Sequence, residues 1–156
     1  MAKVLWLLFP ALLFLEPRVK TVNLQQLQAI AAKQNNDTLY VVNFWATWCK
    51  PCVGEMPYFE KADAAFKEKK VKVVFVSLNS AREEASVEKF VADKSIKPEV
   101  VLLSAGNPNA WIDSIDKSWS GDIPATAMYR NGKKVFFREG EFTQNDLDSI
   151  IKTKIK

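Results

Sequence analysis

Two cysteines three positions apart, Cys49 and Cys52, are the residues of this chain best suited to carry out chemistry. The chain has no other cysteine. Such a pair can carry two electrons, as a dithiol or a disulfide, if its first sulfur is accessible and its thiolate is stabilised. If Cys49 begins a helix, its sulfur can accept N–H groups of the first turn and lies at the positive end of the helix dipole. Cys49 is then the nucleophile, and Cys52 resolves the mixed disulfide.

The spacing alone also fits an inert buried pair or a structural disulfide, but absent residue types exclude other chemistry. The chain has no histidine, which excludes Ser-His and Cys-His nucleophile pairs and histidine metal sites. A structural zinc site would need a second ligand pair, which the sequence lacks. Covalent haem attachment is excluded as well, because Val53 rather than histidine follows Cys52.

Length and composition predict a single folded domain after a short N-terminal segment. The 156 residues suffice for one core, and hydrophobic (48%) and charged (26%) fractions are those of ordinary folded proteins. A formal charge of +4, spread along the chain, is too small to indicate nucleic-acid binding. No repeat or linker follows the first segment, so we assign residues 1–20 to that segment and 21–156 to the domain.

The N-terminal segment contains an apolar run at residues 4–15, preceded by Lys3 and interrupted by Pro10. This arrangement is typical of a secretory signal. As a helix the run would span about 18 Å, too short to cross a bilayer alone. Residues 13–17 offer no small-x-small cleavage site. We interpret the run as an export signal or membrane anchor, and a retained apolar extension is the alternative.

Beyond the N-terminal segment, strand and helix patterns alternate, which predicts an α/β sheet with helices on both faces. Apolar runs predict two buried strands, at residues 39–45 and 71–78, and a short strand at 100–103. Helical spacing and caps predict five helices. The first spans residues 24–33, the second runs from the cysteines to about residue 69, and the third follows the capping box Ser80-x-x-Glu83. The fourth lies within residues 107–115, and the last begins at residue 143. Asn131-Gly132 between residues 125–130 and 135–138 predicts a β-hairpin.

The segment NFWATWCKPC at residues 43–52, followed by Glu55-Met56-Pro57, resembles the active-site segment of the thioredoxin superfamily. The resemblance extends from about Asn23 to the C-terminus and is closest to the exported TlpA/ResA-like branch. It implies a thioredoxin fold, with a central mixed sheet flanked by helices on both faces. Residues 79–122 then hold a strand–helix insertion before the cis-proline strand.

A second landmark of the superfamily, a cis-proline opposite the cysteines, matches the segment at residues 121–126. The resemblance implies that the Ile123–Pro124 bond is cis and that the backbone of Ile123 binds an extended substrate segment. It also implies that Trp48 forms part of the apolar rim on which that segment rests. An ordinary trans proline, and a core position for Trp48, are the alternatives.

Thioredoxin carries a buried aspartate that accepts the proton of the resolving thiol, and the matching residue here is Asn43, which cannot take up a proton. The resemblance to the TlpA/ResA-like branch implies that Glu55, one helical turn after Cys52, fills that role. A partly buried carboxylate there would have a raised pKa and could exchange a proton with Cys52. A solvent-facing surface glutamate is the alternative.

These residues and the resemblance predict a thiol–disulfide oxidoreductase that acts on protein or peptide substrates with an upstream thiol electron donor. The electrons reside on the Cys49–Cys52 pair, so we expect no organic cofactor and no metal. We expect a monomeric reductase in the periplasm or another extracytoplasmic space, with residues 4–15 as a membrane tether. A non-catalytic binding module with a static disulfide is the rival interpretation. The absence of histidine and Pro124 opposite the thiols argue against a copper chaperone.

Overall fold

The computed structural model describes residues 18–32 and 37–156, so the apolar run at residues 4–15 and the predicted helix end at Lys33 lie outside the described residues. The elements are, in chain order, β1 (Val19–Val22), α1 (Leu24–Ala31), β2 (Leu39–Trp45), α2 (Lys50–Ala65), η1 (Lys67–Lys69), β3 (Val71–Ser77), η2 (Ala81–Glu83), α3 (Glu84–Asp93), β4 (Glu99–Leu103), η3 (Pro108–Ala110), α4 (Ile112–Ile115), β5 (Ala125–Arg130), β6 (Lys133–Glu139) and α5 (Gln144–Lys154).

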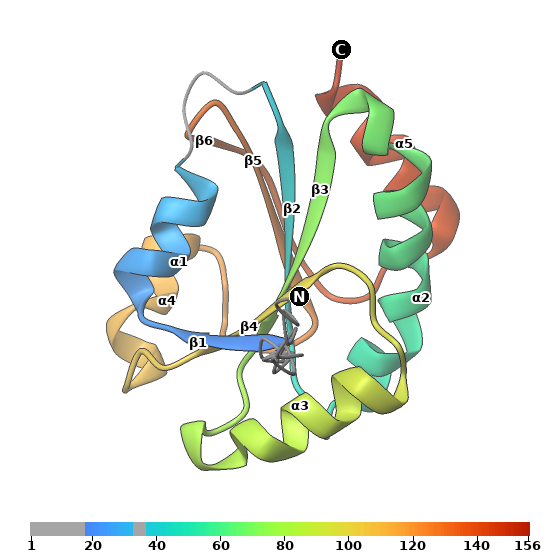
Figure 1. The fold of residues 1–156 in the computed structure, drawn as a ribbon. Helices are drawn as coiled ribbons and strands as arrows, with labels where there is room; N and C mark the ends of the chain where they lie inside the picture. Colours follow the sequence, from blue (N-terminus) through green and yellow to red (C-terminus); the bar gives the residue numbers. More distant parts are fainter. Residues whose placement is uncertain (1–17, 33–36) are drawn as a thin grey trace, which may run out of the picture.

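Within the described residues, the strands form one mixed sheet in the order β1-β4-β3-β2-β5-β6. The first four strands in this order are parallel, and β5 and β6 run antiparallel to their neighbours. Helices α2, α3 and α5 cover one face, and α1 and α4 cover the other (Figure 1). The predicted mixed sheet between two helical layers is confirmed, and the inserted strand β4 lies between β1 and β3.

Strand β1 is not predicted by the sequence pattern. Val19 and Lys20, which we assigned to the N-terminal segment 1–20, are part of the sheet and pair with Val100 and Val101 of β4. The sheet therefore begins two residues before the predicted start of the domain. A run of four residues is too short for a clear period of two, and its partner strand lies far along the chain.

The central strand β2 is buried along its whole length and separates two apolar clusters. Val41 and Trp45 pack with the cluster under α2, α3 and α5, whereas Val42 and Phe44 pack with the cluster under α1. Side chains alternate between the faces of a strand, so Asn43 points toward α2. The alternation thus places one polar side chain beneath the helix that carries the second cysteine.

The β5–β6 hairpin turns at Asn131-Gly132, as predicted. Both residues have positive φ values, 50° for Asn131 and 74° for Gly132, which is the requirement of a type I′ turn. Strand β6 is longer than the predicted residues 135–138 and ends at Glu139. The extra length brings Glu139 next to the loop that precedes Pro124.

Candidate active site

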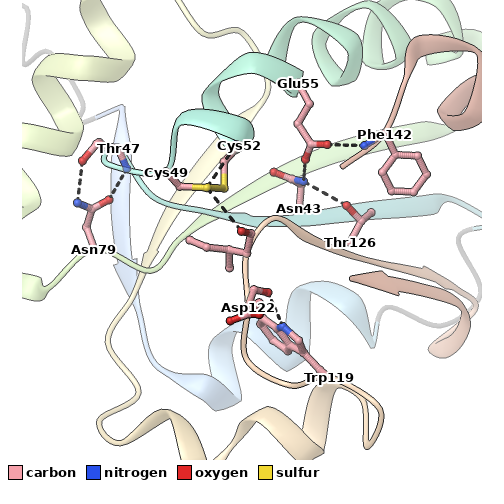
Figure 2. Close-up of a disulfide and its surroundings, with 11 residues drawn as sticks. Asn43, Thr47, Cys49, Cys52, Glu55, Asn79, Trp119, Asp122, Thr126 and Phe142 are labelled. Atoms are coloured by element: carbon pink, nitrogen blue, oxygen red, sulfur yellow. Dashed lines mark hydrogen bonds between the residues drawn. A yellow bond between two sulfur atoms is a disulfide. The ribbon is translucent and has the colours of Figure 1, made fainter. Parts of the chain in front are cut away.

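The cysteine pair lies at the first turn of α2, directly after the loop that leaves β2. Cys49 is the N-cap residue of α2, and its sulfur accepts a hydrogen bond of 3.3 Å from the backbone N–H of Cys52. The two residues are joined by a disulfide (Figure 2). Cys49 retains 6% of its surface exposed and Cys52 none. A sulfur atom of another molecule can therefore approach the disulfide only at Cys49.

The backbone of Ile123 faces the disulfide from the other side. The Ile123–Pro124 peptide bond is cis. The carbonyl oxygen of Ile123 lies 3.7 Å from the sulfur of Cys49 (Figure 2). When the pair is reduced, this oxygen is placed to accept a hydrogen bond from the Cys49 thiol. The first cysteine thus lies between a helix N-terminus, which favours its thiolate, and a carbonyl, which favours its thiol.

The loop before Pro124 is held in place by two side chains. The indole N–H of Trp119 donates to the carbonyl of Asp122 across 2.8 Å. The carboxylate of Glu139 accepts from the backbone N–H groups of Ser120 and Asp122, at 3.1 and 3.0 Å, and from the Ser120 hydroxyl. Burial acts to raise the pKa of Glu139, but these hydrogen bonds outweigh it and lower the pKa. The ionised carboxylate therefore fixes the backbone that leads into Ile123.

On the opposite side, Asn79 holds the loop between β2 and the cysteines. Its side-chain oxygen accepts from the backbone N–H of Thr47 at 3.0 Å, and its amide nitrogen donates to the Thr47 hydroxyl at 2.8 Å (Figure 2). The hydroxyl of Ser77 donates to the same oxygen. Because Asn79 is buried, these bonds form away from competing water. Asn79 therefore positions the residue two places before Cys49.

Glu55 is buried, with 2% of its surface exposed, which excludes the solvent-facing alternative. Its oxygens accept hydrogen bonds from the side-chain amide of Asn43 at 2.9 Å and from the backbone N–H of Phe142 at 2.7 Å (Figure 2). Burial raises the pKa of Glu55 to about 7, although the bonds from Phe142 and Asn43 act to lower it. Cys52 and Glu55 lie three residues apart on α2, so they share one face of the helix.

Asn43 connects three elements at this point. Its amide nitrogen donates to Glu55 of α2 and lies 3.1 Å from the hydroxyl oxygen of Thr126 of β5. Both Asn43 and Thr126 are fully buried. An amide cannot be ionised, so Asn43 contributes a hydrogen bond and Glu55 is the group that can hold a proton.

The sequence pattern of the Redoxin family matches residues 16–135, which is more than half of the chain. The chain belongs to the Redoxin family. A protein of Oceanobacillus iheyensis named thiol-disulfide oxidoreductase ResA is 49% identical over 112 residues, which cover 71% of this redoxin and 54% of that protein. A protein of the same name from Bacillus thuringiensis subsp. konkukian is 32% identical over 114 residues, which cover 71% of this chain and 60% of that protein.

A solved structure shows that this redoxin shares its fold with known proteins. A thiol:disulfide interchange protein of the thioredoxin family from Chlorobium tepidum TLS superimposes with a TM-score of 0.63 at 24% sequence identity. The match covers 77% of this chain and 81% of that chain. With the ResA relatives, it confirms the resemblance to the TlpA/ResA-like part of the thioredoxin superfamily. The chain spans about 54 to 60% of the length of those two relatives.

Trp48, which directly precedes Cys49 in this redoxin, is 65% exposed, which excludes a core position for its side chain. Trp111 and Trp119, by contrast, are buried in the cluster under α1 and α4. An indole that remains in solvent next to a reactive sulfur offers a large apolar contact to an approaching chain. The surface around Cys49 therefore presents one aromatic ring and one backbone carbonyl.

Residues 18–32 and 37–156 contain no group of three or more His, Cys, Asp or Glu side chains arranged to hold a metal ion. In the same part of the redoxin, none of the helices has the length and hydropathy needed to span a membrane.

Several residues that shape the site carry no recognisable signal in the sequence. Asn79, Thr126, Glu139 and Phe142 each contact the site from a segment far along the chain or from another strand. Thr126 ends the segment 121–126 that matches the cis-proline landmark, and Asn79 precedes the capping box at Ser80. That local pattern explains the helix start but not the contact with the cysteine loop.

Proposed function

We propose that this redoxin is a thiol–disulfide oxidoreductase that reduces disulfides in protein or peptide substrates. The observation that carries the proposal is the Cys49–Cys52 disulfide at the N-terminus of α2, in which Cys49 keeps a small part of its surface exposed and Cys52 none. Two curated relatives bear the name thiol-disulfide oxidoreductase, which supports the same reaction class. The pair supplies both electrons, and no organic cofactor takes part in the exchange.

In the proposed cycle, an upstream thiol donor first reduces the disulfide to a dithiol. The Cys49 thiolate then attacks a substrate disulfide, and one substrate sulfur leaves as a thiolate. Cys52 gives its proton to the carboxylate of Glu55, and its sulfur attacks Cys49 in the mixed disulfide. The second substrate sulfur leaves, the Cys49–Cys52 disulfide forms again, and the substrate has gained two electrons.

Glu55 is the proposed general base of the resolving step. A base acts best when its pKa lies near the working pH, and the pKa of Glu55 is about 7. At neutral pH a substantial fraction of Glu55 is therefore ionised and can take the proton of Cys52. Asn43 and the backbone of Phe142 position the carboxylate for this step.

Substrate binding is proposed at the surface that surrounds Cys49. An extended segment can rest its apolar side chains on Trp48 and form backbone hydrogen bonds with Ile123, as in β-strand addition. Pro124 has no N–H group, so it does not compete for those bonds. Trp48, Ile123 and Pro124 all belong to this chain, so the proposed binding surface needs no residue of a second copy.

We further infer that the reaction takes place outside the cytoplasm. Lys3 and the apolar run at residues 4–15 have the character of an export signal or membrane tether, which supports this location. Disulfides persist in oxidising compartments, where a dedicated reductant has substrates. Protease added outside intact cells tests the location, because it should digest this chain, or a reporter protein fused to its C-terminus, only if the domain lies outside the cytoplasm.

The activity is tested by reduction of insulin with dithiothreitol as the electron donor. The wild type should accelerate insulin precipitation, and Cys49→Ser should not. Cys52→Ser is the matched variant, because it keeps the nucleophile but cannot resolve; mass spectrometry should detect its mixed disulfide with the substrate. If insulin precipitates no faster with the wild type than with dithiothreitol alone, the result would instead favour the binding module with a static disulfide.

A further inference from the structure

A groove of about 330 Å³ lies between α2 and the segment that joins β6 to α5, and Glu55 forms part of its wall. The groove is lined by neither cysteine and does not include Ile123 or Trp48. It is therefore distinct from the surface at which a substrate reaches the disulfide. In Figure 2, Glu55 lies between the disulfide and Phe142, which also lines the groove.

The two hydrogen-bond partners of Glu55 cannot carry its proton onward. The side-chain amide of Asn43 and the backbone N–H of Phe142 both act as donors to the carboxylate, and amide nitrogens are not basic. A proton taken from Cys52 must therefore leave Glu55 by way of water. A single water needs about 10–15 Å³ of probe volume, so the groove has room for several.

Gly54 forms part of the groove wall, inside α2. Apart from its chain neighbours and the nearby backbone of α2, a Cβ atom at this position would meet no atom within 4 Å, and the backbone of Gly54 is not in the positive-φ region. Neither crowding nor backbone geometry therefore requires glycine here. Glycine in a helix interior is destabilising relative to alanine. The missing side chain leaves the space beside Glu55 open.

Charged and titratable groups from every neighbouring element face the groove. They are Tyr58 of α2, Arg138 of β6, Glu141 of the connecting segment and Asp146 of α5. The Arg138 guanidinium lies 4.5 Å from the ring centre of Phe142. The charge of Glu141 raises the pKa of Glu55 and that of Arg138 lowers it, but burial is the largest influence. The groove is thus polar enough to hold water.

We propose that this groove is the route by which Glu55 exchanges its proton with solvent, and that Gly54 keeps the route open. The inference rests on the proposed function. When Cys52 attacks the mixed disulfide, its proton passes to the Glu55 carboxylate. Water in the groove then takes this proton and releases it to bulk solvent. No electrons move in the step, and the carboxylate is ready for the next cycle.

The test uses the full chain in its disulfide form, so that it does not depend on turnover. A laser-induced pH jump is followed by time-resolved infrared spectroscopy at the carboxylic C=O stretch of Glu55, which is identified by its loss in Glu55→Gln. In Gly54→Leu, protonation and deprotonation should both slow by about tenfold. Gly54→Ala is the matched control, because it adds only a Cβ in open space, and its rates should stay within about twofold of the wild type.

Equal slowing of the protonation and deprotonation of Glu55, with an unchanged pKa, indicates that the route is blocked. A change in the surroundings of the carboxylate would instead shift its pKa. Gly54→Gln places a longer polar side chain over the same opening and guards against a folding defect of Gly54→Leu. Wild-type rates in both variants would overturn the route. Failure of the proposed function is a separate result, since it would appear as an absence of insulin reduction by the wild type.

Discussion

The side-chain amide of Asn43 donates a hydrogen bond of 2.9 Å to the carboxylate of Glu55, which links the central strand β2 to helix α2 inside the protein. A residue that cannot bind a proton therefore positions one that can. The same amide nitrogen lies 3.1 Å from the hydroxyl of Thr126. The ionisation of Glu55 thus depends on a contact with the centre of the sheet as well as on burial.

Glu55 should make the stability of the disulfide form depend on pH. Its pKa is about 7 in the folded protein, against 4.5 for an unperturbed group, so the folded chain holds the proton more tightly. The stabilisation is complete below pH 4.5 and is lost as the pH rises through about 7. The loss is about 3 kcal/mol, because a tenfold change in proton affinity corresponds to about 1.4 kcal/mol.

Urea unfolding from about pH 4 to about pH 8 measures this dependence. Glu55→Gln is the control, since glutamine is similar in size and does not ionise. Its free energy of unfolding should lack the decline seen for the wild type over this range. Parallel profiles for the two proteins would show that Glu55 does not titrate with a raised pKa.

Asn43→Ala should raise the pKa of Glu55 further, because the hydrogen bond from Asn43 acts to lower it. It should also destabilise the protein by about 1–3 kcal/mol, as a buried carboxylate loses a donor. Thr126→Val is the matched control: it removes the hydroxyl beside Asn43 but no contact with Glu55. Infrared titration of Glu55 measures the pKa, and an equal rise in both variants would contradict the role given to Asn43.

Glu139→Ala should weaken substrate binding without impairing the chemistry at sulfur. The carboxylate of Glu139 holds Ser120 and Asp122, which lead into Ile123. We expect a higher KM for insulin and an unchanged rate with a small aromatic disulfide, and Glu139→Gln should be intermediate because its carbonyl still accepts hydrogen bonds. Equal loss of activity with both substrates would mean that Glu139 acts on the cysteines themselves.

Trp48→Ala tests the apolar rim at the site. Because the indole is exposed, the free energy of unfolding should change by no more than about 0.5 kcal/mol. The KM for insulin should rise severalfold, whereas Trp48→Phe should retain most of the binding. Steady-state kinetics with insulin and with a small disulfide separates the two effects. An unchanged KM in Trp48→Ala would remove Trp48 from the binding surface.

The features predicted from the sequence depend on residues close together in the chain. Cys49 begins α2 because its own side chain caps the first turn, and the apolar run at residues 39–45 forms the buried strand β2. The turn at Asn131-Gly132 follows from the tolerance of these two residue types for positive φ. Each of these outcomes is determined by local geometry, so a short segment carries enough information.

The tertiary structure alone decided the surroundings of the cysteines. Glu55 is buried and its pKa is raised because distant segments pack around it, among them the backbone of Phe142, 87 residues further on. Val19 joined the sheet only because Val100 lies beside it. Such contacts arise when distant segments pack together, and the proton affinity of a carboxylate depends on that packing. The segment around Cys49 and Cys52 therefore predicted the reaction class, whereas the fold determined the environment of Glu55.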